Sequence, residues 1–185
     1  MPHEPRPVLQ VSRKARIAIC GQAPGTKVHI SGRPFTDASG DRLRDWLGVD
    51  EAVFYDLKKL AIIPMGFCFP GQTAKGADLP PRKECSSQWH DGLFQLLPNL
   101  DLILLVGKYA IEYHLKKHTL LSKFSKQPLY EVVSNYDEFF SLCVDSSLYL
   151  PLPHPSWRNN HWLKKNLWFE EFYLPKLRKE VLKRL

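Results

Sequence analysis

Long apolar runs are missing from this sequence. Hydrophobic residues make up 44% of its 185 residues, yet no stretch approaches the roughly 18 consecutive apolar residues that a membrane-spanning helix requires. The first sixteen residues contain three prolines and no apolar core of the kind found in secretion signals. We therefore expect a cytoplasmic protein without a membrane segment. We also expect one domain over residues 1–185, in which residues 1–15 are an extended lead-in.

Cysteine pairs are missing as well. The four cysteines stand at positions 20, 68, 85 and 143, and no two of them form a CxxC pair. This spacing gives no dense disulfide framework, so we expect reduced thiols. Internal repeats and low-complexity tracts are also absent.

Acidic residues are in the minority. The chain has 19 Asp and Glu residues against 26 Lys and Arg residues, which gives a net charge of +7 and an isoelectric point near 9.2. A polyanion is a natural partner for such a chain, although many basic proteins bind none.

The most informative stretch runs from Ile17 to Leu43. Residues 16–20 (RIAIC) are a short apolar run typical of a buried parallel strand, and the GQAPG sequence at residues 21–25 ends it with residues that let the backbone approach a ligand. The loop that follows lasts about fifteen residues, and loops of that length in a compact domain are usually binding or catalytic segments. We therefore expect the functional site here.

The apolar pattern predicts the other strands and helices. We expect strands at residues 60–65, 102–106, 139–144 and 149–152. We expect helices at residues 39–47, 85–97 and 108–118, and amphipathic helical structure with a kink at Pro175 in the last 25 residues. Residues 66–82 are rich in glycine and proline, so we expect an irregular loop that shapes a pocket mouth.

Two of these helices carry finer expectations. The helix at 39–47 can be capped by Thr36, Asp37 or Ser39 and ended by Gly48. The helix at 85–97 is expected to bury an apolar face made of Trp89, Leu93, Leu96 and Leu97.

Strands that alternate with helices predict an α/β fold with a mainly parallel central sheet. In such sheets, ligands bind beyond the carboxyl ends of the strands. The GQAPG loop, the loop at Gly66, the turn at Gly107 and the HPSWRNN segment at 154–160 each follow a predicted strand. We therefore expect all four segments to converge on one crevice.

Two short motifs lie at opposite ends of this arrangement. GQAPG follows the first strand and HPS, at residues 154–156, follows the last, and together they resemble the two signature motifs of the uracil-DNA glycosylase superfamily. The 13-residue step from Gln22 to Phe35, inside GRPF, resembles the step from the first motif to the uracil-stacking phenylalanine in the iron-sulfur branch of that superfamily. The resemblance covers roughly residues 16–160 and includes the LPPRKEC segment.

The resemblance implies a three-layer αβα sandwich with a short, mainly parallel central sheet. It also implies an enzyme that flips a uracil or other deaminated base out of DNA and hydrolyses its N-glycosidic bond. Phe35 would stack on the base, and His154 would donate a hydrogen bond to the uracil O2 as charge develops there. Without the motifs, Phe35 could be a core residue and His154 a turn residue. The residues matched to substrate binding are Gly21, Ala23, Pro24, Gly25, Phe35, Ala61 and Ser156.

The segment after His154 also carries residues matched to DNA binding. In the superfamily this segment enters the minor groove, so Trp157 and Arg158 are candidates for a base-displacing wedge and a phosphate contact, with Asn159 beside them. Arg158 could instead be a solvated surface charge.

The first motif departs from several branches of the superfamily. Those branches carry a carboxylate there to position water, whereas this chain has Gln22, which cannot act as a base. Asp37 lies close enough in the loop to take that role, and the branch without a carboxylate in its first motif looks similar at this point. Asp37 could also cap the following helix, and both roles can hold together. The expected catalytic set is therefore His154, Asp37 and Gln22.

A second departure concerns base selection. Many members have an asparagine at the end of the second strand that reads the uracil edge, and this chain has Ala61 there. A pocket with an apolar wall and one histidine donor discriminates less, so deaminated purines become candidate substrates.

A third departure concerns metal. Cys68 and Cys85 match two of the four cluster ligands of the iron-sulfur branch, but the expected CxxC pair before the first strand is missing. Two thiolates do not hold a 4Fe-4S cluster, so one would need two ligands from outside this chain. We expect no metal and no other cofactor.

These features together predict a monomeric, monofunctional DNA glycosylase of base excision repair. No lysine lies within either motif, so no covalent lysine intermediate is expected. The alternative is a catalytically weak or inactive DNA-binding module of the same fold, which Gln22 and Ala61 favour. An unrelated hydrolase using His154 and Ser156 fits less well, because these residues are too close in sequence and no Gly-x-Ser-x-Gly elbow is present.

Overall fold

Five short strands form the centre of the structure, a computed structural model that describes residues 4–185. The sheet has the order β2-β1-β3-β5-β4, and only β4 runs antiparallel to its neighbour. The strands are β1 (Ile17–Cys20), β2 (Leu60–Ile62), β3 (Leu102–Val106), β4 (Cys143–Val144) and β5 (Ser147–Leu152). Every residue of β1, β2, β3 and β5 is buried, as expected for parallel strands that are covered on both faces.

The register of the sheet gathers the chain segments that follow the strands. Cys20 of β1 pairs with Leu105 of β3, and Val106 of β3 pairs with Leu152 of β5. Since these three strands are parallel and end level with one another, the loops that follow them leave from the same edge of the sheet. The site described below lies at this edge.

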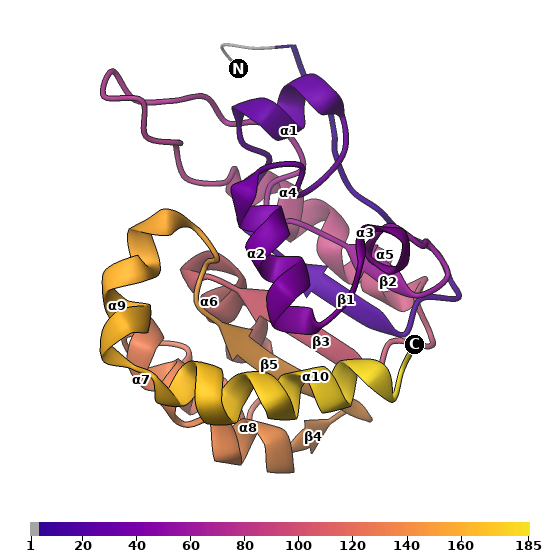
Figure 1. Cartoon of the computed structure of the whole chain (residues 1–185). Helices are drawn as coiled ribbons and strands as arrows, with labels where there is room; N and C mark the ends of the chain where they lie inside the picture. The colour runs from indigo at the N-terminus through magenta and orange to yellow at the C-terminus, as the bar shows by residue number, and fades with distance from the viewer. Residues whose placement is uncertain (1–3) are drawn as a thin grey trace.

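Helices cover both faces of the sheet (Figure 1). Helices α2 (Ala38–Leu47) and α10 (Leu174–Leu182) pack together on the face toward the viewer in Figure 1. On the other face, α6 (Lys108–Lys117) packs against the helical stretch from α4 (Lys83–Cys85) to α5 (Asp91–Gln95). The fold is therefore the predicted three-layer αβα sandwich.

Shorter helical segments connect these layers. They are α1 (Thr26–Ser31), α3 (Glu51–Phe54), α7 (Leu129–Ser134), α8 (Tyr136–Ser141), α9 (Asn160–Lys165), the 3-10 turns η2 (Ser122–Phe124) and η3 (Trp157–Asn159), and the π-helical turns η1 (Ser86–His90) and η4 (Phe169–Tyr173). No helix among residues 4–185 is long and apolar enough to cross a membrane.

Helix α2 has the predicted caps. The Asp37 carboxylate accepts a hydrogen bond from the Gly40 backbone amide at 3.2 Å, and Gly48 ends the helix in the left-handed conformation with φ 69°. Its buried face consists of Gly40, Leu43, Trp46 and Leu47. The N-terminus of α2 lies at the sheet edge where the loops meet, since Asp37 and Ser39 line the cavity there.

The lead-in before β1 is extended, as predicted from its prolines. Its backbone runs along the outer side of β2, where Gln10 and Ile62 form an antiparallel bridge. The Val8 amide donates to the Phe67 carbonyl at 2.8 Å. The prediction for residues 1–3 lies outside the described residues.

The strand predicted at 139–144 is wrong for most of its length. Residues 136–141 form helix α8, and only Cys143 and Val144 are strand. The apolar pair Phe139 and Phe140 suggested a strand, but a short apolar run fits a buried helix turn equally well. Here Phe139 is 1% exposed and α8 packs against β5.

The apolar face predicted for the helix at 85–97 is also partly wrong. Trp89 and Leu96 are 59% and 60% exposed, whereas His90 is 1% exposed and Leu97 is 5% exposed. The reason is the π-helical turn η1, because a wider turn rotates the following residues relative to a regular α-helix.

Two other predictions need smaller corrections. The loop predicted after GQAPG contains helix α1, which ends at Gly32 with φ 70°. The last 25 residues are helical, but α9 ends at Lys165 and the helical path resumes through η4 into α10. Pro175 lies in the first turn of α10, directly after the π-helical turn η4.

Candidate active site

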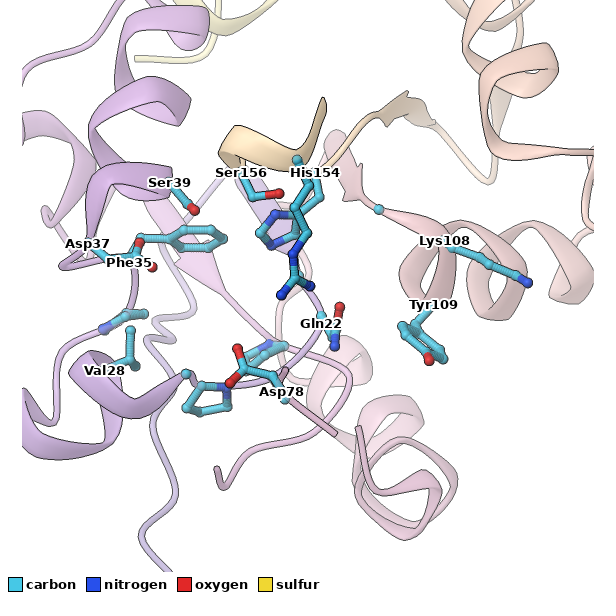
Figure 2. A pocket seen from close by; sticks show the side chains of 18 of the residues that line it. Gln22, Val28, Phe35, Asp37, Ser39, Asp78, Lys108, Tyr109, His154 and Ser156 are labelled. Atoms are coloured by element: carbon cyan, nitrogen blue, oxygen red, sulfur yellow. The ribbon is translucent and has the colours of Figure 1, made fainter. Parts of the chain in front are cut away.

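A cavity of about 460 Å³ opens at the carboxyl edge of the sheet (Figure 2). The four segments that the sequence predicted to converge all contribute to its walls, as do the residues before and at the start of α2, Val8 of the lead-in, Val28 of α1 and Leu129 of α7. The lining includes Gly21, Gln22, Ala23, Pro24, Gly25, Phe35, Asp37, Ser39, Asp78, Gly107, Lys108, Tyr109, His154, Ser156, Trp157, Arg158 and Asn159. A volume of this size is ordinary for a small-molecule or nucleobase pocket.

The GQAPG loop forms the floor between β1 and the loop after β2. The Met65 amide donates to the Gly21 carbonyl at 2.9 Å, and the Gly66 amide donates to the Gln22 carbonyl at 2.9 Å. These bonds hold the loop backbone in place. The Gln22 side chain stays half-buried and lines the cavity.

Phe35 lines the cavity in a strained backbone conformation. Its φ is 54°, a value that a bulky side chain rarely adopts. Its carbonyl accepts hydrogen bonds from the Tyr55 hydroxyl at 3.1 Å and from Arg44 Nη1 at 3.3 Å. Gly40 approaches so closely that a Cβ there would lie 1.8 Å from the Phe35 oxygen. The surroundings thus fix the ring, and strain of this kind is concentrated at functional sites.

Phe35 and His154 lie next to one another across the cavity, as Figure 2 shows. The His154 imidazole packs against Gly107, where a Cβ would lie 3.7 Å from its Cδ2 atom. Gly107 has a φ of 84° at the turn between β3 and α6. A glycine there permits both the turn and the close approach of the ring.

Burial lowers the pKa of His154 below its ordinary value. The Arg158 guanidinium also lowers this pKa, and the carboxylates of Asp37 and Asp78 act in the opposite direction. Since the net shift is downward, the imidazole is neutral at pH 7 and keeps one N–H that can donate into the cavity. The two carboxylates at the cavity wall limit the fall in its pKa.

The His154 backbone is held from both sides of the HPSWRNN segment. Asn159 Nδ2 donates to the His154 carbonyl at 2.6 Å, and the Tyr130 hydroxyl donates to Asn159 Oδ1 at 2.6 Å. On the other side, Arg42 Nη1 donates to the Ser156 carbonyl at 3.2 Å and to Asn160 Oδ1 at 2.8 Å. The loop is therefore tied to α2 and α7.

The sequence left two roles open for Asp37, capping the following helix and positioning water, and the location of Asp37 is compatible with both. Its Oδ1 atom caps α2, and the residue also lines the cavity beside Phe35. A carboxylate has lone pairs on both oxygens, so capping leaves acceptor capacity for a water molecule.

An exposed aromatic and a cation flank the cavity mouth. Trp157 is 74% exposed, and the Arg158 Cζ atom lies 5.9 Å from the centre of its ring. Both residues line the cavity. Tryptophan and arginine are both enriched in surfaces that contact a partner.

The comparison with known proteins agrees with this geometry. The sequence model of the Uracil DNA glycosylase superfamily matches residues 9–178. The chain belongs to this superfamily. Membership indicates DNA glycosylase activity, which is a hydrolysis carried out on DNA. Both motifs fall inside the matched range, as do all of the lining residues except Val8.

Ala61 is the exception among the matched residues. It is completely buried in β2 and is not part of the cavity wall, where its neighbour Ile62 lies instead. The side chain at the end of β2 is thus apolar in either case. Neither Ala61 nor Ile62 has a polar side chain that could take the place of the asparagine found at this strand in many superfamily members.

Asp78 lines the cavity although the sequence analysis did not single it out. It comes from the loop after β2, which was predicted to shape a pocket mouth, and its carboxylate reaches the cavity beside the GQAPG loop. Lys108 and Tyr109, from the first turn of α6, also contribute to the wall. These residues follow predicted strands in the sequence, and this position is the pattern by which they could have been predicted to line the site.

The thiols do not form a cluster site within the described residues. The pKa of Cys68 is raised, mainly by burial. A hydrogen bond with the Arg6 backbone opposes this rise, and the nearby Cys85 adds to it. Cys20 is buried in β1 and Cys143 is exposed on β4. Two neighbouring thiols are half of the ligand set that a 4Fe-4S cluster needs, so these residues do not fit that group. Among residues 4–185, no group of three or more His, Cys, Asp or Glu side chains could hold a metal ion.

Proposed function

We propose that this protein removes uracil or another deaminated base from DNA by hydrolysing the N-glycosidic bond. The observation that carries the proposal is the meeting of Phe35, His154 and Asp37 in one cavity, although they come from distant parts of the sequence. A flat ring, a neutral donor and a carboxylate are the groups that this reaction requires.

The flipped base would stack on Phe35 and point its oxygen at His154. As the C1′–N bond breaks, its electron pair moves onto the base nitrogen, so the base becomes anionic and the sugar becomes cationic. The neutral His154 imidazole then donates its N–H to the base oxygen that gains charge. A donor of this kind strengthens its bond in the transition state, which is how it accelerates the reaction.

Water completes the reaction on the sugar. Asp37 would orient a water molecule whose oxygen adds to C1′, and the proton released from that water passes to the carboxylate or to solvent. The base anion then takes up a proton from solvent, so that the products are the free base and an abasic site. Gln22 would contribute pocket shape and an amide that can hydrogen-bond to water or base, but no general base.

Base selection would be permissive. Ile62 gives the cavity an apolar wall. The isoleucine side chain cannot form a hydrogen bond that selects one particular base edge. Apolar walls discriminate weakly between ligands, whereas a dedicated polar group rejects a mismatched partner strongly. We therefore propose deaminated purines as substrates beside uracil. No step of this mechanism uses a metal or other cofactor.

Single-turnover assays on oligonucleotides that contain uracil, hypoxanthine or xanthine test the proposal. The wild-type protein should release at least one of these bases, and His154→Ala should lower the rate by about 10²-fold or more, as loss of an oxyanion donor does. His161→Ala is the matched control, because His161 is exposed on α9 and should keep the full rate. A wild-type protein that binds DNA but releases no base would favour the inactive DNA-binding module.

The same assay separates a monofunctional from a lyase mechanism. Lys108 lines the cavity, but its Nζ atom lies 3.4 Å from Glu112 and its side chain points away from the cavity in Figure 2. Borohydride should therefore trap no protein-DNA adduct during base release. A trapped adduct that disappears in Lys108→Ala would replace the water mechanism with a lysine nucleophile.

A further inference from the structure

Asp78 is carried by a small hairpin beside the cavity. Gln72 and Asp78 form an antiparallel bridge. The Leu79 amide donates to the Gly71 carbonyl at 2.9 Å, and the Thr73 amide donates to the Ala77 carbonyl at 2.8 Å. The hairpin projects from the body of the protein in Figure 1, so its base is fixed next to the cavity while its tip extends into solvent.

Both oxygens of the Asp78 carboxylate have defined neighbours. Oδ1 accepts a hydrogen bond from Gln72 Nε2 at 3.1 Å. Oδ2 lies 3.5 Å from the point that a Cβ of Gly25 would occupy. The carboxylate thus lies close to the GQAPG loop, and Figure 2 shows it across the cavity from His154.

The depth of Asp78 decides which part of a flipped nucleotide it meets. Phe35 and His154 are half-buried, whereas Asp78 is exposed at the mouth. A base inserted between Phe35 and His154 leaves its sugar nearer the mouth. The negative charge of Asp78 therefore lies on the side where the sugar becomes cationic.

We propose that Asp78 is a second carboxylate of the reaction, which stabilises the positive charge that develops on the sugar as the base leaves. This inference rests on the proposed glycosylase function. Asp37 and Asp78 divide the work: Asp37, beside Phe35, orients the water, and Asp78 acts through its charge without taking a proton. Preorganised charge of this kind is a major source of catalysis.

Several charged groups line the same cavity. Asp37 and Asp78 are anionic, Arg158 is cationic and the His154 imidazole is titratable. Lys108 also lines the wall, but its side chain points away from the cavity toward Glu112. Asp78 also raises the pKa of His154, opposing Arg158. Its charge is therefore felt across the cavity.

An anion at the mouth should also repel the phosphates on either side of the flipped nucleotide. Asp78 would then weaken DNA binding while it speeds the chemistry. This pair of opposite effects is a signature that a purely structural residue would not give, because damage to the pocket lowers both the rate and the affinity.

The test compares Asp78→Asn with the wild-type protein in two measurements. Asn keeps the acceptor for Gln72 and removes only the charge. The single-turnover rate at saturating enzyme should fall about tenfold or more, while the affinity for a duplex containing an abasic site should rise several-fold at low salt. Glu170→Gln is the matched control, since it removes the same charge from an exposed site on η4 and should change neither value.

The outcomes separate this proposal from the glycosylase function itself. If Asp78→Asn keeps the full rate while His154→Ala loses it, the glycosylase function stands and the role of Asp78 falls. A lower rate with unchanged or weaker DNA binding would also overturn it, as would equal gains in affinity in Asp78→Asn and Glu170→Gln. If the wild-type protein releases no base, both proposals fail together.

Discussion

At the scale of single residues, the Phe35 backbone shows how this site is held in place. A residue with positive φ costs roughly 1–3 kcal/mol, and the hydrogen bonds from Tyr55 and Arg44 to its carbonyl offset that cost. The Tyr55 hydroxyl has a single proton, which it shares between the Phe35 carbonyl and the Pro34 carbonyl, whose oxygen lies 2.7 Å away. These contacts and the closeness of Gly40 leave the ring little freedom, so the base would meet a preformed surface.

Gly40→Ala should therefore disturb both stability and base release. The added Cβ would meet the Phe35 oxygen and must push the loop away, and overpacking of this kind costs about 1–3 kcal/mol. Thermal unfolding and single-turnover rates would measure the two effects. Gly92→Ala is the matched control, because Gly92 is also helical and nothing lies within 4 Å of its added Cβ. This substitution should raise the free energy of unfolding by roughly 0.5–1 kcal/mol. Equal activity in both variants would contradict this account of Phe35.

At the scale of secondary-structure elements, the site depends on how α2 and α7 hold the HPSWRNN segment. Arg42 of α2 binds Ser156 and Asn160, and Tyr130 of α7 binds Asn159, which in turn holds the His154 carbonyl. The Tyr130 ring also stacks on Trp162, with ring centres 4.7 Å apart. His154 is thus positioned through its backbone carbonyl and through the neighbouring residues of the segment.

Arg42→Gln should slow base release by about tenfold, the equivalent of about 1.4 kcal/mol. Because Arg42 acts through the position of His154, the same change should have no further effect in a His154→Ala background. A double-mutant cycle on single-turnover rates measures this coupling. Independent, additive losses would show that Arg42 does not act through His154.

A second element-scale prediction concerns the buried histidines of η1 and α6. Burial lowers the pKa of His114 well below its usual value, with smaller contributions from His90 and Lys117, and burial likewise lowers the pKa of His90. The unfolded chain therefore binds protons that the folded protein excludes. The contribution of these histidines to the free energy of unfolding is therefore complete above about pH 6.5. It is lost as the pH falls below that value toward the lowered pKa values.

Urea unfolding at several pH values between 7.5 and 4.5 would measure this loss. His114→Leu should flatten the pH dependence, whereas the exposed His161→Ala should leave the slope of the wild-type protein unchanged. A wild-type unfolding free energy that stays constant as the pH falls below 6.5 would contradict the assignment.

The sequence predicted these elements unevenly, and the reasons are physical. The strands at 17–20 and 102–106 were readable because both faces are buried, so their residues are continuously apolar. Helix α8 was mistaken for a strand because its apolar run is short. The exposed Trp89 could not be foreseen, since nothing in the sequence predicts a π-helical turn.

The candidate site was partly readable for similar reasons. GQAPG and HPS are local patterns, so their meeting followed from the parallel sheet. Asp78 depends on how a hairpin folds back across the cavity mouth, which is a tertiary property. Ala61 and Ile62 differ by one position, and the pattern of a fully buried strand does not specify which of the two reaches the cavity.

At the scale of the whole molecule, the cations that give the net charge of +7 differ in whether a partner within the protein already engages them. Some cations are already engaged within the protein: Arg33 pairs with Glu51 at 2.8 Å and lies 3.5 Å from the centre of the Tyr55 ring. Arg158 is exposed at the cavity mouth instead. Exposed cations of this kind are available for phosphates.

DNA binding should therefore weaken steeply as salt increases, and Arg158→Ala should lower the affinity for all sequences alike while reducing the salt slope by about one unit. Titrations at several salt concentrations provide the measurement. Lys58→Ala is the control, because Lys58 precedes β2 at the amino edge of the sheet, opposite the cavity. An affinity that is the same at low and physiological salt would contradict a phosphate-binding surface.

The lead-in along β2 has a consequence for how copies of this protein behave toward one another. β2 is the last parallel strand of the sheet, and an unpaired outer strand is a template for joining another chain. Here Ile62 exchanges hydrogen bonds with Gln10 at 2.9 and 2.7 Å, and the Gln10 side chain donates to the Leu60 carbonyl at 2.9 Å. The chain thus covers the outer edge of its own sheet with the lead-in, which opposes edge-to-edge aggregation between copies.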